Sequence, residues 1–114
     1  MKNKLCIYDI GAANFLPEHF PLKNDLVYVH FEPDVRRLNA LKQWLKLKKT
    51  KANHFFFNQA VGETSKIARL ELAPKNTSSS IAEPGFDGEH VDVTMAPLNL
   101  FIPEHNLPFP DVIK

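Results

Sequence analysis

The chain has 114 residues, which limits it to one domain of modest size. Its formal charge of +1 argues against a protein held to nucleic acid mainly by charge, and its single cysteine excludes an internal disulfide. Apolar residues make up 44% of the chain, enough to form a core. No signal peptide or transmembrane run stands out, so we expect a cytoplasmic protein without a membrane partner.

The first predicted element is a strand over residues 4–10, which form a nearly continuous apolar run. Such a run is typical of a strand that is covered on both faces in a parallel sheet. Asp9 lies near its carboxyl end, and Gly11, Ala12 and Ala13 then remove side-chain bulk where the chain must turn. Ligands bind outside the carboxyl ends of strands in open α/β sheets. This turn is therefore a candidate cofactor site, and an ordinary strand–turn–helix junction is the alternative.

The next elements alternate between strand and helix. Two prolines limit residues 15–20 to a turn or a short helix, and residues 26–31 are rich in β-branched and aromatic side chains, as strands are. Apolar residues with helical spacing predict a helix over residues 34–48, with Asp34 as its N-terminal cap. A third strand follows at residues 54–58. This order predicts a parallel sheet with right-handed crossovers.

The second half of the chain has a different pattern. Residues 66–72 and 90–95 alternate apolar and polar side chains, which predicts an antiparallel extension of two half-exposed strands. Residues 74–88 are rich in Ser, Asn, Pro and Gly and predict a surface loop. We expect a short helix over residues 96–102, capped by Thr94, and the start of a fourth strand at residues 111–114.

Polar residues end the three predicted parallel strands. Asp9 and Glu32 lie 23 positions apart, and Asn58 ends the third strand. In nucleotide-binding α/β domains, the acid that ends the second strand accepts hydrogen bonds from the ribose hydroxyls. A carboxylate suits this role because it only accepts hydrogen bonds. Asn58 could contact a purine with one donor and one acceptor. The sequence therefore predicts a cofactor site at one edge of the sheet.

The turn after the first strand favours a methyl donor over a dinucleotide. A dinucleotide site requires G-x-G-x-x-G, but here only Gly11 is present, and bulky residues such as Phe15 stand where phosphate must approach. Asp9 would also repel phosphate, whereas it suits the sulfonium or amino group of S-adenosyl-L-methionine.

The sequence resembles the FkbM-type S-adenosylmethionine-dependent methyltransferases. The resemblance covers nearly the whole chain, in the family's order and with similar spacing. It is carried by Tyr8-Asp9-Ile10-Gly11-Ala12-Ala13, Phe31-Glu32-Pro33-Asp34, Asn58-Gln59-Ala60-Val61-Gly62, Ser78-Ser79-Ser80, Val91-Asp92-Val93-Thr94 and Pro110-Asp111-Val112-Ile113-Lys114.

The resemblance implies a Rossmann-like class I methyltransferase fold that transfers methyl groups, mostly to oxygen, on small hydroxylated acceptors such as sugars or natural products. It places Asp9 and Gly11 near the methionine part of the cofactor, Glu32 at the ribose and residues 58–60 beside the adenine. Two departures are Asn14-Phe15, where the family often has glycine, and Asn99, where it usually has aspartate. Residues 1–114 are expected to form the incomplete, N-terminal cofactor-binding half of the domain. The acceptor and the catalytic residues stay unidentified.

Other residues carry weaker signals. The five histidines lack metal-ligand spacing and are expected to be structural or solvated, so no metal is predicted. Lysines near the end of the helix are more typical of a solvated face than of an anion site. Because the predicted sheet is incomplete, the sequence leaves the enzymatic activity of this short chain open. The alternative is a non-catalytic module that binds a nucleotide or a protein, and an exposed sheet edge would favour self-association.

Overall fold

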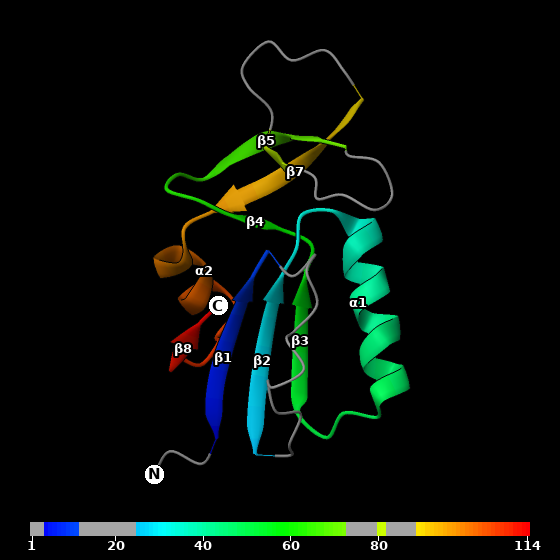
Figure 1. The fold of residues 1–114 in the computed structure, drawn as a ribbon. Helices are drawn as coiled ribbons and strands as arrows, with labels where there is room; N and C mark the ends of the chain where they lie inside the picture. The colour runs from blue at the N-terminus through cyan, green and yellow to red at the C-terminus, as the bar shows by residue number, and fades with distance from the viewer. Residues whose placement is uncertain (1–3, 12–24, 73–79, 82–88) are drawn as a thin grey trace.

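A computed structural model describes residues 4–11, 25–72, 80–81 and 89–114. In these residues it contains two four-stranded sheets and two helices (Figure 1). The fold is α/β, with one parallel sheet and one mixed sheet, and is compatible with a Rossmann-like fold. The predicted turn or helix at residues 15–20, together with Ala12 and Ala13, lies outside the described residues.

The parallel sheet has the strand order β3-β2-β1-β8. Its strands are β1 (Leu5–Ile10), β2 (Leu26–Phe31), β3 (Asn53–Phe57) and β8 (Val112–Ile113). All three pairings are parallel, which confirms the predicted parallel strands and the fourth strand near residue 112. The register places Asp9 beside His30 and His30 beside Phe56. These three residues therefore project from the same face of the sheet.

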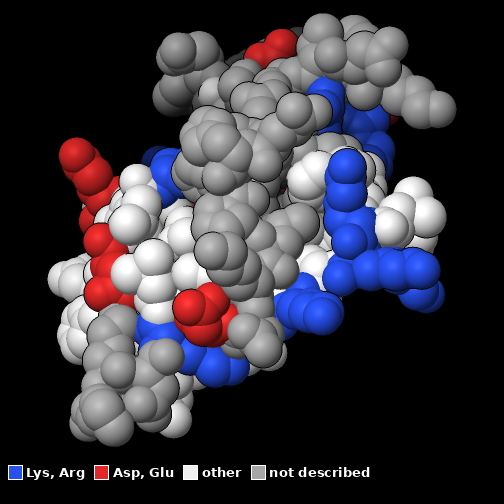
Figure 2. Space-filling view, turned by 60° about the horizontal axis from the view of Figure 1, so that its bottom comes forward, with Lys and Arg blue, Asp and Glu red and all other residues white. Residues whose placement is uncertain are grey.

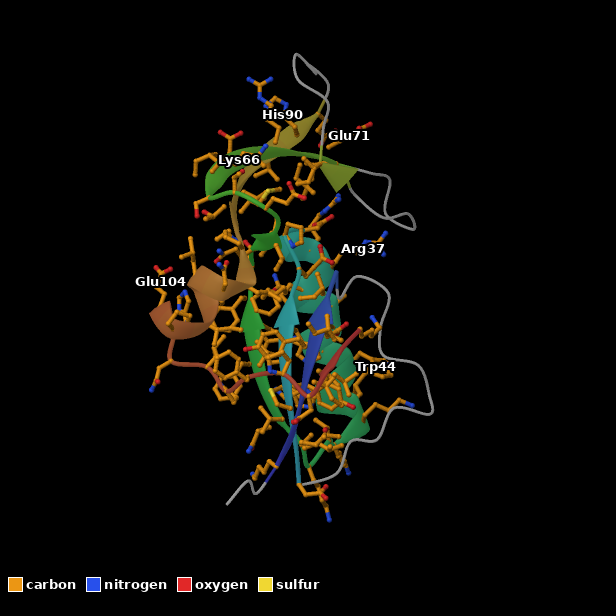
Figure 3. The ribbon with its side chains drawn as sticks, turned by 90° about the vertical axis from the view of Figure 1, so that its left-hand side faces the viewer. Arg37, Trp44, Lys66, Glu71, His90 and Glu104 are labelled. Atoms are coloured by element: carbon orange, nitrogen blue, oxygen red, sulfur yellow. The ribbon has the colours of Figure 1, made fainter. Side chains whose placement is uncertain are left out.

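Two helices lie on opposite sides of this sheet (Figure 3). Helix α1 (Val35–Lys48) begins after Asp34, whose carboxylate accepts a hydrogen bond from the Arg36 N–H, so the predicted cap is confirmed. Helix α2 (Leu98–Glu104) follows Pro97, which makes no side-chain cap. The predicted start at residue 96 and the Thr94 cap are wrong, because strand pairing continues through Ala96.

The mixed sheet lies across the carboxyl ends of the parallel strands (Figure 1). It has the order β4-β7-β5-β6, and its strands are β4 (Ala60–Val61), β5 (Lys66–Glu71), β6 (Ser80–Ile81) and β7 (His90–Ala96). The antiparallel pair β5–β7 confirms the predicted extension. Strand β4, which pairs parallel to β7, was not predicted. Strand β6 lies inside the predicted loop at 74–88, the rest of which lies outside the described residues.

Candidate functional site

A pocket of about 180 Å³ lies between the two sheets, at the carboxyl ends of β1 and β2. We call it the edge pocket. It contains four of the residues predicted to bind the cofactor, and it is lined by Ile10, Gly11, Phe31, Pro33, Gln59, Ala60, Val61, Leu70 and Ile81. The mixed sheet thus forms one wall of the pocket and the ends of the parallel strands form the other.

Gly11 shapes the turn out of β1. Its φ of +69° is in the left-handed region, which glycine adopts without strain. The Gly11 N–H donates to the Phe31 carbonyl at 2.9 Å, and this hydrogen bond joins the ends of β1 and β2. Among the described residues, and apart from the chain neighbours of Gly11, no heavy atom lies within 4 Å of the position that a Gly11 Cβ would occupy. The sequence needs glycine here for its backbone conformation rather than for close packing.

Glu32 and Asn58 are held in place at the ends of β2 and β3. The Glu32 side chain is only 4% exposed, and its Oε2 accepts a hydrogen bond from the Asp34 N–H at 2.7 Å. The Asn58 amide donates to the carbonyls of Glu32 (2.9 Å) and Pro33 (2.8 Å). Asn58 therefore ties β3 to the segment after β2. The Asn58 side-chain nitrogen donates to these two backbone carbonyls. The predicted contact between Asn58 and a purine stays a prediction.

Asp9 has partners on both of its carboxylate oxygens. It is fully buried, and its Oδ2 lies 2.7 Å from His30 Nδ1. Lys114 Nζ donates to Asp9 Oδ1 at 2.8 Å. Burial acts to raise the pKa of the Asp9 carboxyl, but the hydrogen bonds from His30 and Lys114 outweigh it and leave the pKa lowered. Asp9 is therefore an ionised carboxylate at neutral pH, enclosed by two of its own chain's side chains.

The contacts of His30 continue toward α1. His30 Nε2 lies 2.8 Å from His54 Nδ1, and His54 Nε2 lies 3.0 Å from Thr50 Oγ1. We call Asp9, His30, His54 and Thr50 the histidine relay. The pKa of His54 is lowered to about 4, mainly by burial and to a smaller extent by the neighbouring His30. The sequence predicted that the five histidines are structural or solvated, and the structure shows that His30 is buried and hydrogen-bonded. The sequence spacing did not indicate that His30 lies beside His54, because the two come from different strands.

The outer end of the histidine relay opens on a second pocket, of about 370 Å³. We call it the lysine pocket. It is lined by His54, Thr50, Leu45, Phe56 and the three lysines Lys42, Lys46 and Lys49. These lysines are exposed, as the sequence predicted, and Figure 2 shows basic side chains gathered on one side of the molecule.

Two searches of the described residues for other kinds of site gave negative results. No group of three or more His, Cys, Asp or Glu side chains in the described ranges is arranged to hold a metal ion. Neither helix of the described chain is long and apolar enough to cross a membrane.

Comparisons of the chain with protein-family models, with curated proteins and with solved structures found no match.

Proposed function

We propose that this chain is the cofactor-binding portion of an S-adenosyl-L-methionine-dependent methyltransferase that methylates an oxygen atom of a small hydroxylated acceptor. The observation that carries the proposal is the edge pocket, which lies at the carboxyl ends of β1 and β2 and is lined by Ile10 and Pro33, the chain neighbours of Asp9 and Glu32. This is the position at which open α/β sheets bind ligands. The resemblance to FkbM-type methyltransferases points to the same residues.

Glu32 is the proposed ribose ligand. A ribose offers two neighbouring hydroxyl donors, and a carboxylate is a hydrogen-bond acceptor that can serve both. The contact between Glu32 Oε2 and the Asp34 N–H fixes the direction of this side chain at the start of α1. A fixed carboxylate loses less conformational entropy when it binds a ligand.

Gly11, Pro33, Gln59 and Ala60 would supply the walls around the cofactor. None of the described residues beyond its chain neighbours occupies the position of a Gly11 Cβ, so none of these residues blocks a ligand from the backbone of the turn there. The volume of about 180 Å³ is below the ~300–1,000 Å³ typical of small-molecule pockets. We therefore assign these residues one part of the cofactor site rather than all of it.

Asp9 has an indirect role in this proposal. Its carboxylate is buried and contacts His30 and Lys114. Asp9 would then position the turn at Gly11 and supply negative charge close to it, instead of binding the methionine part of the cofactor through its own oxygens. Methyl transfer depends mainly on holding donor and acceptor in line, so precise placement of this turn is a contribution to catalysis.

Titration calorimetry with S-adenosylmethionine tests the proposal. Glu32→Ala removes the ribose acceptor and should weaken binding at least tenfold, since hydrogen bonds to charged groups contribute ~1.5–3 kcal/mol. Glu32→Gln keeps an oxygen that can accept from the Asp34 N–H and separates loss of the ligand contact from loss of local structure. Glu63→Ala, at an exposed acid beyond β4, is the matched control. Absence of binding at millimolar cofactor, or an unchanged affinity in Glu32→Ala, would contradict the proposal.

The second candidate function is a non-catalytic module that binds a protein. Exposed apolar side chains on β8 and in the segment before it favour this function, because Val112 and Ile113 of β8 are 43% and 58% exposed and the preceding Phe109 is 79% exposed. A strand edge with apolar side chains is a template for pairing with another chain. Sedimentation across a range of concentrations would show self-association through this edge, and Ile113→Lys should then abolish it.

A further inference from the structure

The hydrogen bonds of the histidine relay fix where its protons lie. Asp9 is ionised, so His30 Nδ1–H donates to it. If both histidines are neutral, His30 Nε2 must accept from His54 Nδ1–H. His54 Nε2 then accepts from the Thr50 hydroxyl, whose oxygen accepts from the Ala52 N–H at 3.2 Å. Each donor in this arrangement meets one acceptor.

We propose that His30 and His54 together form a one-proton binding site, which takes up a proton from the lysine pocket and holds it next to Asp9. The inference goes beyond the proposed methyltransferase function and does not depend on it, because the relay consists of residues of the parallel sheet and of Thr50, which follows α1.

Proton uptake reverses two hydrogen bonds. The Thr50 hydroxyl turns its hydrogen toward the lysine pocket, and His54 Nε2 takes a proton from water. His54 passes its Nδ1 proton to His30 Nε2. His30 is then an imidazolium that donates to Asp9 and to His54, and His54 is neutral again with its proton on Nε2, donating to Thr50. One proton has entered, no other group has changed its charge, and His54 has changed tautomer.

The surrounding charges favour His30 as the place where the proton is held. Its Nδ1 is in direct contact with the Asp9 carboxylate, which also binds the Lys114 ammonium. His54 instead faces the lysine pocket, which is lined by the cations Lys42, Lys46 and Lys49. Burial, and then the charge on the neighbouring His30, lower the pKa of the His54 imidazole, so positive charge is disfavoured on His54.

In the described part of the chain, the aromatic rings of Tyr28 and Phe56 that pack against the two histidines carry no charge. The Tyr28 ring lies nearly parallel to both imidazoles, at 7° to each, and burial raises its pKa to about 12, so it stays neutral. The Phe56 ring packs against His30 with centroids 5.1 Å apart. The described groups around the relay therefore direct the proton toward the Asp9 end.

Nitrogen NMR of the imidazole rings tests the proposal on the wild-type chain between pH 5 and pH 8, where histidines ordinarily titrate. We expect His54 to change from the Nδ1–H to the Nε2–H tautomer at the same midpoint at which His30 gains its second N–H. His90 and His105, which lie outside the relay, are internal references. A constant His54 tautomer, or separate midpoints for the two rings, would overturn the proposal.

His30→Gln provides the matched variant, since glutamine retains a polar side chain but cannot carry the proton. We expect the tautomer change of His54 to disappear in this variant. A change of tautomer at the wild-type midpoint would show that His54 acts alone and would overturn the shared site. If the variant does not fold, the wild-type titration decides the question by itself.

Discussion

The two faces of the parallel sheet have opposite chemistry although they belong to the same strands. The face under α2 is apolar and aromatic, and its buried residues are Cys6, Tyr8, Val29 and Phe31, with Phe101 and Ile102 of α2. The face under α1 combines apolar packing with the histidine relay, so that a carboxylate and an imidazole are fully buried there. Alternation along each strand separates the two sets of side chains.

The two acids near the carboxyl ends of β1 and β2 have different environments, because Asp9 lies within β1 in register with His30 and Glu32 lies beyond the last residue of β2. Asp9 lies on the α1 face and is enclosed by His30 and Lys114. Glu32 follows the end of β2 and is directed by the backbone at the start of α1. The proposed function accordingly assigns the direct contact with a cofactor to Glu32 and an indirect role to Asp9.

The largest loss of stability is expected from a substitution on the apolar face under α2. Phe101 is 2% exposed, and its ring centroid lies 5.0 Å from that of Phe31 and 4.9 Å from that of Phe57. Phe101→Ala should lower the free energy of unfolding by about 3–5 kcal/mol, because it removes a large buried ring and leaves a cavity. Urea unfolding measures this loss. Leu100→Ala, at a neighbouring residue that is 53% exposed, should cost far less; equal losses would refute the packing described.

A somewhat smaller loss of stability is expected from a substitution on the face under α1. His30→Leu removes the partner of both Asp9 Oδ2 and His54 Nδ1, and should cost about 3 kcal/mol, since buried polar atoms then lose hydrogen bonds. Lys114 still contacts Asp9, which limits the loss. His90→Leu, on an exposed strand position, is the control. The same urea measurement applies, and a neutral His30→Leu would mean that the relay contributes nothing to stability.

The turn at Gly11 belongs to neither face. Gly11→Ala should cost ~1–2 kcal/mol, because an alanine at φ +69° is strained although it meets no neighbouring atom. Gly11→Asn should cost less, since asparagine tolerates this conformation better. Thermal unfolding of the two variants measures the difference. An alanine variant as stable as the wild type would indicate that the turn does not hold this conformation.

The smallest effect is the pH dependence that distinguishes the α1 face from the apolar face. The pKa of His54 is about 4 in the folded chain against 6.5 for an ordinary histidine. The unfolded chain therefore binds the extra proton between these values, and the contribution of His54 to stability is present above pH 6.5 and is lost as the pH falls toward 4.

Because His54 is partly exposed, solvent screening narrows the pH range over which the free energy of unfolding falls, without changing the sign of its slope. Urea unfolding at several pH values measures this slope. His54→Gln should flatten the curve in this window, whereas Phe101→Ala should lower the whole curve without changing its slope. A variant curve parallel to the wild type would contradict the shift at His54.

Sequence patterns predicted the parallel strands and α1 because their signals are local. Alternation, helical spacing and the cap at Asp34 each depend on residues within one turn or one strand. Strand β4 has only two residues, too few to show a period, and its formation depends on pairing with β7. The relay could not be predicted for the same reason, since His30 and His54 meet only through the register of β2 and β3.

Amide NMR tests most directly whether the cofactor binds in the edge pocket, because it distinguishes binding there from binding in the lysine pocket. Titration with S-adenosylmethionine is expected to shift the amide signals of Gly11, Ala60 and Val61, which line the edge pocket, and to leave those of Lys46, Lys49 and Thr50 in place. Shifts confined to the lysine pocket, or no shifts at millimolar cofactor, would contradict the assignment of the edge pocket as the cofactor site.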